Sequence, residues 1–130
     1  MRHKFGYYII KSDINEVWLG TLNFWNRNRG KIVDQFISDN HLFRKLKIRH
    51  GLTLASYGET YKMLFGYHPS VNLTFVAVDI KLVFGTGLIW LKAVEMMKKW
   101  AFEMRIEPVK LMRRSNLGFE KNINEISASF

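Results

Sequence analysis

The fold is decided by residues 71–104, VNLTFVAVDIKLVFGTGLIWLKAVEMMKKWAFEM. Residues 71–80 are rich in apolar and β-branched side chains, which predicts a largely buried strand. Gly85-Thr86-Gly87 follows, and the apolar residues of 88–104 recur at helical spacing. A strand that leads through glycines into a helix presents unpaired backbone N–H groups and the positive end of the helix dipole. This order therefore suits the binding of a phosphate.

The two glycines have a second interpretation, because a pair of glycines after a strand also makes a tight turn and caps a helix. The sequence leaves both interpretations open. Beyond the helix, residues 109–112 predict a short strand, and residues 115–121, SNLGFEK, precede a polar tail.

The N-terminal part of the chain predicts a strand and two helices. Residues 5–10 are aromatic and β-branched, which favours a first strand. Ser12-Asp13 offers an N-cap ahead of apolar residues at helical spacing that continue to Trp25. Residues 26–30 predict a turn and residues 32–37 a second short helix. Residues 42–50 are basic and only loosely periodic, so their state stays open.

A β-hairpin is predicted in the middle of the chain. Residues 52–57 and 61–67 read as strands that flank Gly58-Glu59-Thr60, a short connection that contains glycine. Residues 68–70, HPS, end the second strand. The chain has no repeats and no linker, and its 130 residues suffice to enclose one hydrophobic core. We therefore expect a single domain, 1–130.

This order of elements resembles the GNAT superfamily, the acyl-coenzyme A N-acyltransferases, over about residues 51–121. Trp100-Ala101 in the long helix and Gly118-Phe119-Glu120 in the late segment are similar to features that the family carries at those places. The resemblance implies an α/β (α+β) fold, with a mixed, mostly antiparallel central sheet and helices on both faces. It also implies an acetyl-CoA-dependent N-acetyltransferase that acts on an amine, which the sequence does not identify.

The resemblance further implies which residues hold the acetyl-CoA. Backbone amides of residues 76–78 would splay from the next strand to hold the pantetheine arm, and the loop around Gly85 would hold the pyrophosphate. Where the family has Arg or Gln, three residues before the first glycine, this chain has Leu82, so Lys81 offers the charge instead. The implied cofactor-binding residues are Val76, Ala77, Val78, Lys81, Phe84, Gly85, Thr86, Gly87, Leu88 and Asn116.

Acetyl transfer needs a base that deprotonates the amine and an acid that protonates the departing sulfur. Asp79, at the end of the buried strand, and Glu59, in the predicted turn, are the candidate bases, acting directly or through a water. Tyr57, Tyr61 and Tyr67 are the candidate acids, with Tyr67 preferred, because residues 115–117 leave no room for the helix on which the family often carries a tyrosine. The alternatives are a solvent-facing carboxylate for Asp79, a turn residue for Glu59 and a packing residue for Tyr67.

The chain is basic, with 20 Lys and Arg against 11 Asp and Glu, and its formal net charge is +9. This charge favours an anionic partner, although it also serves solubility. Residues 44–50, RKLKIRH, put five basic groups within seven residues, and residues 27–31 and 110–114 add two more clusters. Phe43 and Trp25 are near enough in sequence to stack on bases. The alternative function is therefore a non-catalytic binding protein, on a degenerate acyltransferase scaffold, for nucleic acid or an acidic partner protein.

Several classes are disfavoured by what the sequence lacks. It contains no cysteine, so neither a disulfide nor a thiolate site can form. Its four histidines, His3, His41, His50 and His68, are isolated from one another, so we expect no metal site. The N-terminus has no signal-peptide pattern and no apolar run reaches about 20 residues, so we expect a cytoplasmic protein without membrane contact. The sequence does not indicate the oligomeric state.

Overall fold

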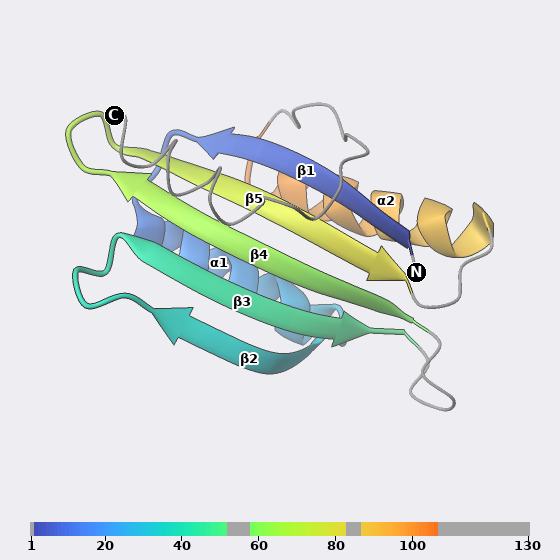
Figure 1. Cartoon of the computed structure of the whole chain (residues 1–130). Helices are drawn as coiled ribbons and strands as arrows, with labels where there is room; N and C mark the ends of the chain where they lie inside the picture. Colours follow the sequence, from blue (N-terminus) through green and yellow to red (C-terminus); the bar gives the residue numbers. More distant parts are fainter. Residues whose placement is uncertain (1, 52–57, 83–86, 107–130) are drawn as a thin grey trace.

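The computed structural model describes residues 2–51, 58–82 and 87–106. These residues form β1 (Arg2–Ile10), α1 (Ile14–Arg27), β2 (Lys31–Ile37), β3 (Phe43–His50), β4 (Glu59–His68), β5 (Leu73–Leu82) and α2 (Gly87–Glu103). The five strands form one sheet in the order β1-β5-β4-β3-β2 (Figure 1). The predicted α+β class and the antiparallel character of the sheet are confirmed, and every pairing of these strands is antiparallel.

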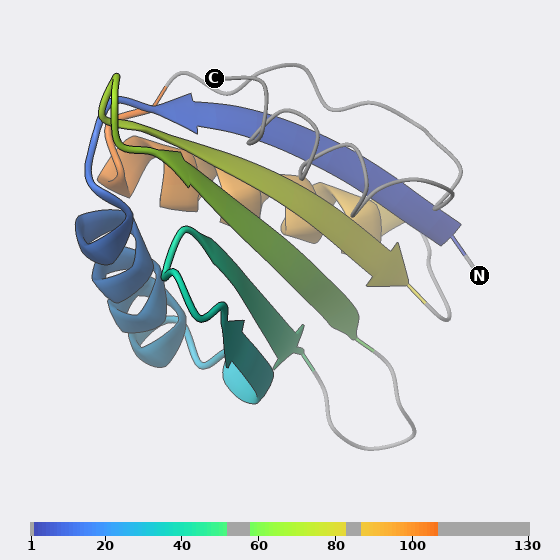
Figure 2. The same ribbon diagram turned by 60° about the vertical axis from the view of Figure 1, so that its left-hand side comes forward.

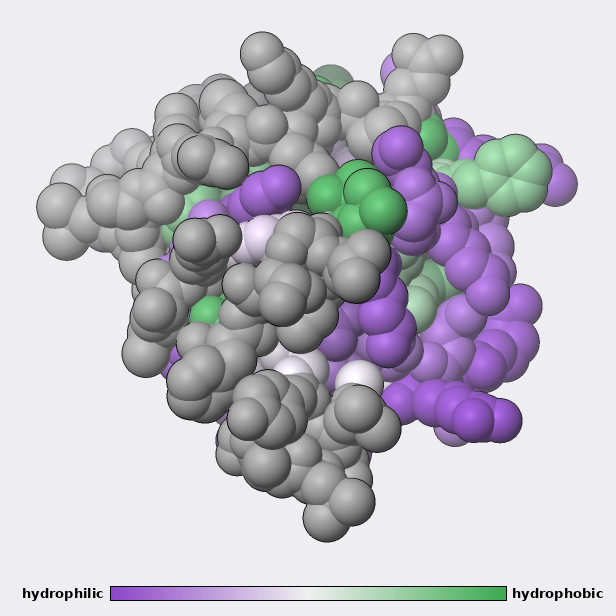
Figure 3. Space-filling model, turned by 90° about the vertical axis from the view of Figure 1, so that its right-hand side faces the viewer, coloured by the Kyte–Doolittle hydropathy of each residue, from purple (hydrophilic) through white to green (hydrophobic). Residues whose placement is uncertain are grey.

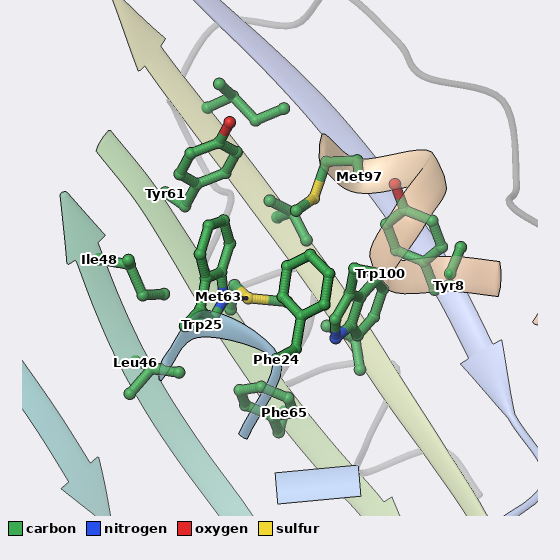
Figure 4. Packing of buried hydrophobic residues seen from close by; sticks show 14 of the residues in the cluster. Tyr8, Phe24, Trp25, Leu46, Ile48, Tyr61, Met63, Phe65, Met97 and Trp100 are labelled. Atoms are coloured by element: carbon green, nitrogen blue, oxygen red, sulfur yellow. Dashed lines mark hydrogen bonds between the residues drawn. The ribbon is translucent and has the colours of Figure 1, made fainter. Parts of the chain in front are cut away.

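Both described helices lie on the same side of the sheet, which we call the first face (Figures 1 and 2). Their side chains join those of the strands in one apolar cluster, which includes Trp25, Tyr61, Met63 and Trp100 (Figure 4). The expected placement on both faces is therefore wrong for these two helices. A helix buries its apolar stripe where a sheet offers apolar residues, and on the opposite face β3 offers basic ones.

Helix α1 begins at the predicted cap. The side chain of Asp13 accepts a hydrogen bond of 2.7 Å from the backbone N–H of Asn15. Trp18 and Trp25 are among the apolar residues that the helix buries. The helix ends before Gly30, where an added Cβ would lie 2.5 Å from the Trp25 ring. A glycine at this position therefore lets the chain pass close to Trp25 on its way into β2.

Strand β2 occupies the segment predicted as a second short helix, so that prediction is wrong. The apolar residues Ile32, Val33, Phe36 and Ile37 have helix-like spacing, but β2 is an edge strand and most of its residues are exposed. Because the strand buries no continuous apolar face, its apolar residues do not follow the two-residue alternation by which a half-buried strand is recognised.

The central hairpin joins β3 to β4 and so differs from the predicted one. Glu59 and Thr60, predicted to be in the turn, lie in β4 opposite His50 and Arg49. Residues 52–57, predicted as the first strand of the hairpin, lie outside the described residues. Strand β4 instead pairs with β3, the basic segment whose secondary structure the sequence did not predict. In β3, apolar residues alternate with charged ones.

Strand β5 and helix α2 confirm the predicted buried strand and long helix, with ends that differ by a few residues. Most of the glycine loop, residues 83–86, lies outside the described residues, as do the predicted strand 109–112 and the segment 115–121. Neither of the two described helices is long and apolar enough to cross a membrane.

Candidate functional site

The face of the sheet opposite the helices, which we call the second face, carries the basic residues of β3. Successive side chains of a strand lie on opposite faces. Leu46 and Ile48 are fully buried in the cluster of the first face. The residues between and beside them therefore lie on the second face, namely Lys45, Lys47 and Arg49.

Arg44 and His50 belong to the first face. Arg44 is buried, its Nη2 donates a hydrogen bond of 2.6 Å to Oδ1 of Asn15, and its guanidinium lies 5.6 Å from the centre of the Trp18 ring. The Nδ1 atom of His50 lies 3.2 Å from Oε1 of Glu59. The basic groups that cluster in this stretch of sequence are therefore divided between the two faces of the sheet.

The strand register aligns basic residues across the width of the second face. Lys31 of β2 lies opposite Arg49 of β3, which lies opposite Thr60 of β4. Thr60 lies opposite Lys81 of β5, and Lys81 lies opposite His3 of β1. We call these residues the basic row. Because neighbouring strands are about 4.8 Å apart, the row extends over about 19 Å, and it contains no carboxylate.

The next row along the strands contains charges of both signs. Its charged members are Asp34, Lys47, Lys62 and Asp79, in the order β2 to β5. Lys47 and Lys62 stand directly opposite each other, and each also stands opposite a carboxylate, Asp34 or Asp79. The charges of this row are therefore balanced within the sheet, in contrast to those of the basic row.

Aromatic residues lie on the same face, next to the basic ones. Phe36 of β2 lies opposite Lys45 and is 51% exposed. Its ring centre lies 6.4 Å from that of Phe43. Further along the strands, Phe5 and Phe75 belong to a small apolar cluster on this face. The second face thus combines cations with exposed and buried aromatic rings.

Asp79, a predicted base, lies on the second face but is buried rather than solvent-facing. Its Oδ1 atom lies 2.8 Å from Nδ1 of His3, and the two side chains are 6% and 20% exposed. Lys62 stands opposite Asp79 on β4. Asp79 is therefore positioned to hold the imidazole of His3 in one orientation.

Glu59, the other predicted base, lies on the first face. Its Oε1 atom accepts a hydrogen bond from the Tyr61 hydroxyl and lies near Nδ1 of His50, both at 3.2 Å. Burial, followed by the negative charge of Glu59, raises the pKa of Tyr61, so the hydroxyl keeps its proton and donates. Tyr67, the predicted acid, lies toward the other end of β4, where its hydroxyl donates to Oδ1 of Asn72 at 2.6 Å. The structure does not bring the two candidate bases and Tyr67 together.

The predicted cofactor-binding residues 76–78 lie in the middle of β5, which pairs with β1 on one side and β4 on the other. Their backbone groups are engaged in the sheet, so the splay expected for a pantetheine arm is not present at these residues. The side chains of Val76 and Val78 join the first-face cluster, and Ala77 joins the second-face cluster. Of the other predicted residues, Lys81 belongs to the basic row, Gly87 and Leu88 open α2, and Phe84, Gly85, Thr86 and Asn116 lie outside the described residues.

The helix side of the molecule carries paired charges. Figure 3 shows hydrophilic side chains gathered on the side where the helices lie. There Lys98 lies 3.7 Å from Glu95, beside an open groove of about 470 Å³. Arg27 lies 2.7 Å from Glu103, beside another groove of about 440 Å³. We take the second face as the candidate site because the strand register gathers the basic row there. No group of three or more His, Cys, Asp or Glu residues in the described part of the chain could hold a metal ion.

Sequence reasoning identified Lys81 but missed His3, Lys31, Thr60 and Lys62 as members of a common surface. These residues come from different strands, and only the register aligns them. The sequence did contain one signal for this surface. Apolar and basic residues alternate within β3, as expected for a strand with one buried face and one basic face.

Comparisons with known proteins add little. No family model matches the chain, and no curated protein matches it. Among solved structures, the chain is similar to an uncharacterised protein from Bacillus thuringiensis, with 9% sequence identity and a TM-score of 0.39, over 78% of this chain and 95% of that one. A likeness this weak carries no argument about function.

Proposed function

We propose that this chain is a non-catalytic protein that binds single-stranded nucleic acid on the second face of its sheet. The observation that carries the proposal is the basic row. Its cationic side chains, Lys31, Arg49, Lys81 and His3 when protonated, are aligned across the five strands with no carboxylate among them.

The charges suit a phosphate backbone. Lys31, Lys47 and Arg49 are exposed, so their ammonium and guanidinium groups are within reach of a ligand. A nucleic acid carries a negative charge at every nucleotide, and neutralising several phosphates releases condensed counterions. The row provides several cations at regular intervals and therefore favours an extended polyanion over a ligand with one charge.

The aromatic residues favour a single strand with unstacked bases. Phe36 is half exposed and lies against Phe43 at the edge of the same face. Bases of single strands stack on such rings, whereas the bases of a duplex are already stacked on one another. A single strand would contact the cations with its phosphates and the rings with its bases, so its chemistry repeats along the surface as these residues do.

Acetyl-CoA-dependent N-acetylation stays a prediction from the family resemblance. Its main support, the loop at Gly85 and Thr86, lies outside the described residues. Asp79, Glu59 and Tyr67 lie apart, and the contact between Glu59 and Tyr61 is buried in the first-face cluster. Calorimetric titration of the protein with acetyl-CoA tests it directly. Absence of binding at millimolar ligand, which corresponds to about −4 kcal/mol, would retire it.

The binding proposal is tested with a fluorescent single-stranded oligonucleotide of about 12 nucleotides, whose anisotropy is followed over a range of salt concentrations. The double variant Lys47→Gln, Arg49→Gln removes two cations of the second face. The matched control Lys92→Gln, Lys98→Gln removes two exposed cations of α2 and changes the net charge equally.

We expect the second-face variant to weaken binding at least about tenfold and to reduce the slope of log affinity against log salt by about 1.4, which is about 0.7 for each lost phosphate contact. The control should leave both quantities nearly unchanged. Equal losses in the two variants would mean that only the total charge matters, which contradicts a defined face. Absence of binding to the oligonucleotide, together with binding to polyglutamate, would replace nucleic acid by an acidic protein partner.

A further inference from the structure

His3 and Asp79 form a pair that the proposed binding of a polyanion does not by itself require. Their contact joins His3 Nδ1 to Asp79 Oδ1 at 2.8 Å. The ring of Phe5 lies parallel to the imidazole, with centres 6.0 Å apart and planes 10° apart. The orientation of the imidazole is therefore set by a buried carboxylate and an aromatic ring. Because Nδ1 faces Asp79, Nε2 is the ring nitrogen left for another partner, and no described residue forms a hydrogen bond with it that the structure records.

The residues next to His3 are donors. Lys81 stands directly opposite His3, and Thr60 stands directly opposite Lys81. An ammonium and a hydroxyl on adjacent strands, at the same level of the sheet, both donate to the oxygens of a phosphate. Asp79 is engaged by His3 and so competes less with a bound anion for the ammonium group of Lys81.

We propose that His3, Lys81 and Thr60 form a phosphate subsite at the β1 end of the basic row, in which Asp79 fixes the orientation of the His3 ring. This inference rests on the proposed binding of nucleic acid. A phosphate oxygen accepts the hydrogen bond from Nε2, and the Asp79 carboxylate accepts the one from Nδ1. Both ring nitrogens then carry protons, so occupation of the subsite takes up a proton.

The charged groups around His3 agree with this arrangement. On the second face these are Asp79 and Lys81 from β5 and Lys62 from β4. Lys4 lies on the first face, with its Nζ 4.9 Å from the centre of the Trp90 ring, and Glu59 also lies there. Among the described residues, the one carboxylate that faces the imidazole is therefore the buried Asp79, and the ammonium group of Lys81 on the same face reinforces the attraction for an anion.

The test uses the same oligonucleotide at constant salt, with the affinity measured between about pH 5 and pH 8, the interval in which histidines change charge. Wild-type affinity should rise as the pH falls, by up to about tenfold per pH unit for one proton taken up. His3→Gln should bind more weakly at low pH and lose most of this pH dependence. His3→Lys should restore the affinity and remain independent of pH, because its cation does not titrate in that interval.

His41→Asn is the matched control, since it removes an exposed histidine whose left-handed backbone (φ 62°) asparagine tolerates. It should keep the wild-type pH profile. If His3→Gln keeps that profile too, or if His3→Lys binds no better than His3→Gln, the subsite is overturned. The effect of Lys47 and Arg49 on the salt slope would then still stand. Absence of binding by the wild type at every pH would instead overturn the proposed function itself.

Discussion

Replacement of Glu59 by alanine should lower the free energy of unfolding by about 4 kcal/mol. The carboxylate is 1% exposed, and its Oε1 atom meets both the Tyr61 hydroxyl and Nδ1 of His50 at 3.2 Å. Tyr61 is fully buried and His50 is nearly so, at 9% side-chain exposure. Alanine would therefore leave two buried polar groups without their partner, at about 1.5 kcal/mol each. The lost methylene adds about 0.8 kcal/mol.

Glu59→Gln separates the hydrogen bonds from the charge. Glutamine keeps the volume and one acceptor oxygen, so both contacts survive as neutral hydrogen bonds. We expect a loss of about 1 kcal/mol, since hydrogen bonds to an ionised acceptor are stronger than neutral ones. The variant should still bind the oligonucleotide like the wild type, because Glu59 lies on the first face of the sheet.

Urea unfolding followed by tryptophan fluorescence measures both variants. Trp25 reports on the cluster, since its ring centre lies 4.6 Å from that of Tyr61. The dependence of the unfolding free energy on urea should be unchanged, which shows that the same surface is exposed on unfolding. A loss below about 1 kcal/mol for the alanine variant, or equal losses for alanine and glutamine, would refute the view that Glu59 satisfies two buried groups.

The remaining predictions concern the packing of the core and its response to pH. Gly30→Ala should cost about 1–3 kcal/mol in urea unfolding, because the new Cβ would lie 2.5 Å from the Trp25 ring and 2.8 Å from Ile48. Gly20→Ala is the matched control, and it should be neutral or stabilising, since its Cβ meets only the flexible end of Met104 and alanine favours the helix. A larger loss of unfolding free energy for Gly20→Ala than for Gly30→Ala would contradict the close packing at Gly30. Burial raises the pKa of Tyr8 from 10.0 to about 12, so the folded protein keeps a proton that the unfolded chain releases above pH 10. Tyr8 should therefore account for a fall in stability of about 3 kcal/mol as the pH rises from 10 toward 12, in addition to the fall due to Tyr61, whose pKa is raised as well. Unfolding at a series of pH values should show a smaller fall for Tyr8→Phe, and an unchanged slope in that variant would contradict the assignment to Tyr8.

The sequence predicted the elements in which local signals agree. Asp13 offers a cap directly before apolar residues at helical spacing, and both act within one or two turns, so α1 begins where expected. The apolar residues of β5 and the helical spacing of α2 are likewise read within their own segments. The prediction failed at β2, an exposed edge strand whose apolar residues do not alternate as those of a half-buried strand do.

The candidate site was less accessible to sequence reasoning. The run of basic residues in β3 indicated an anionic partner, but it did not show that these residues are divided between two faces. The pleat of the strand places Arg44 on the first face, and Lys45, Lys47 and Arg49 on the second. The predicted bases were identified by their position next to predicted turns. In the structure, each of the two carboxylates instead has a histidine partner on a neighbouring strand. Asp79 contacts His3, 76 residues away in the sequence, and Glu59 contacts His50, 9 residues away.

The sequence by itself determined that this chain forms a basic α+β domain with a buried strand that leads into a long amphipathic helix, because composition and periodicity act along the chain. Only the tertiary structure decided that His3, Lys31, Arg49, Thr60 and Lys81 stand in one row. Strand order and register are set by which apolar side chains pack together against the helices on the first face. The alignment of charges on the second face follows from that packing, and no local pattern in the sequence encodes it.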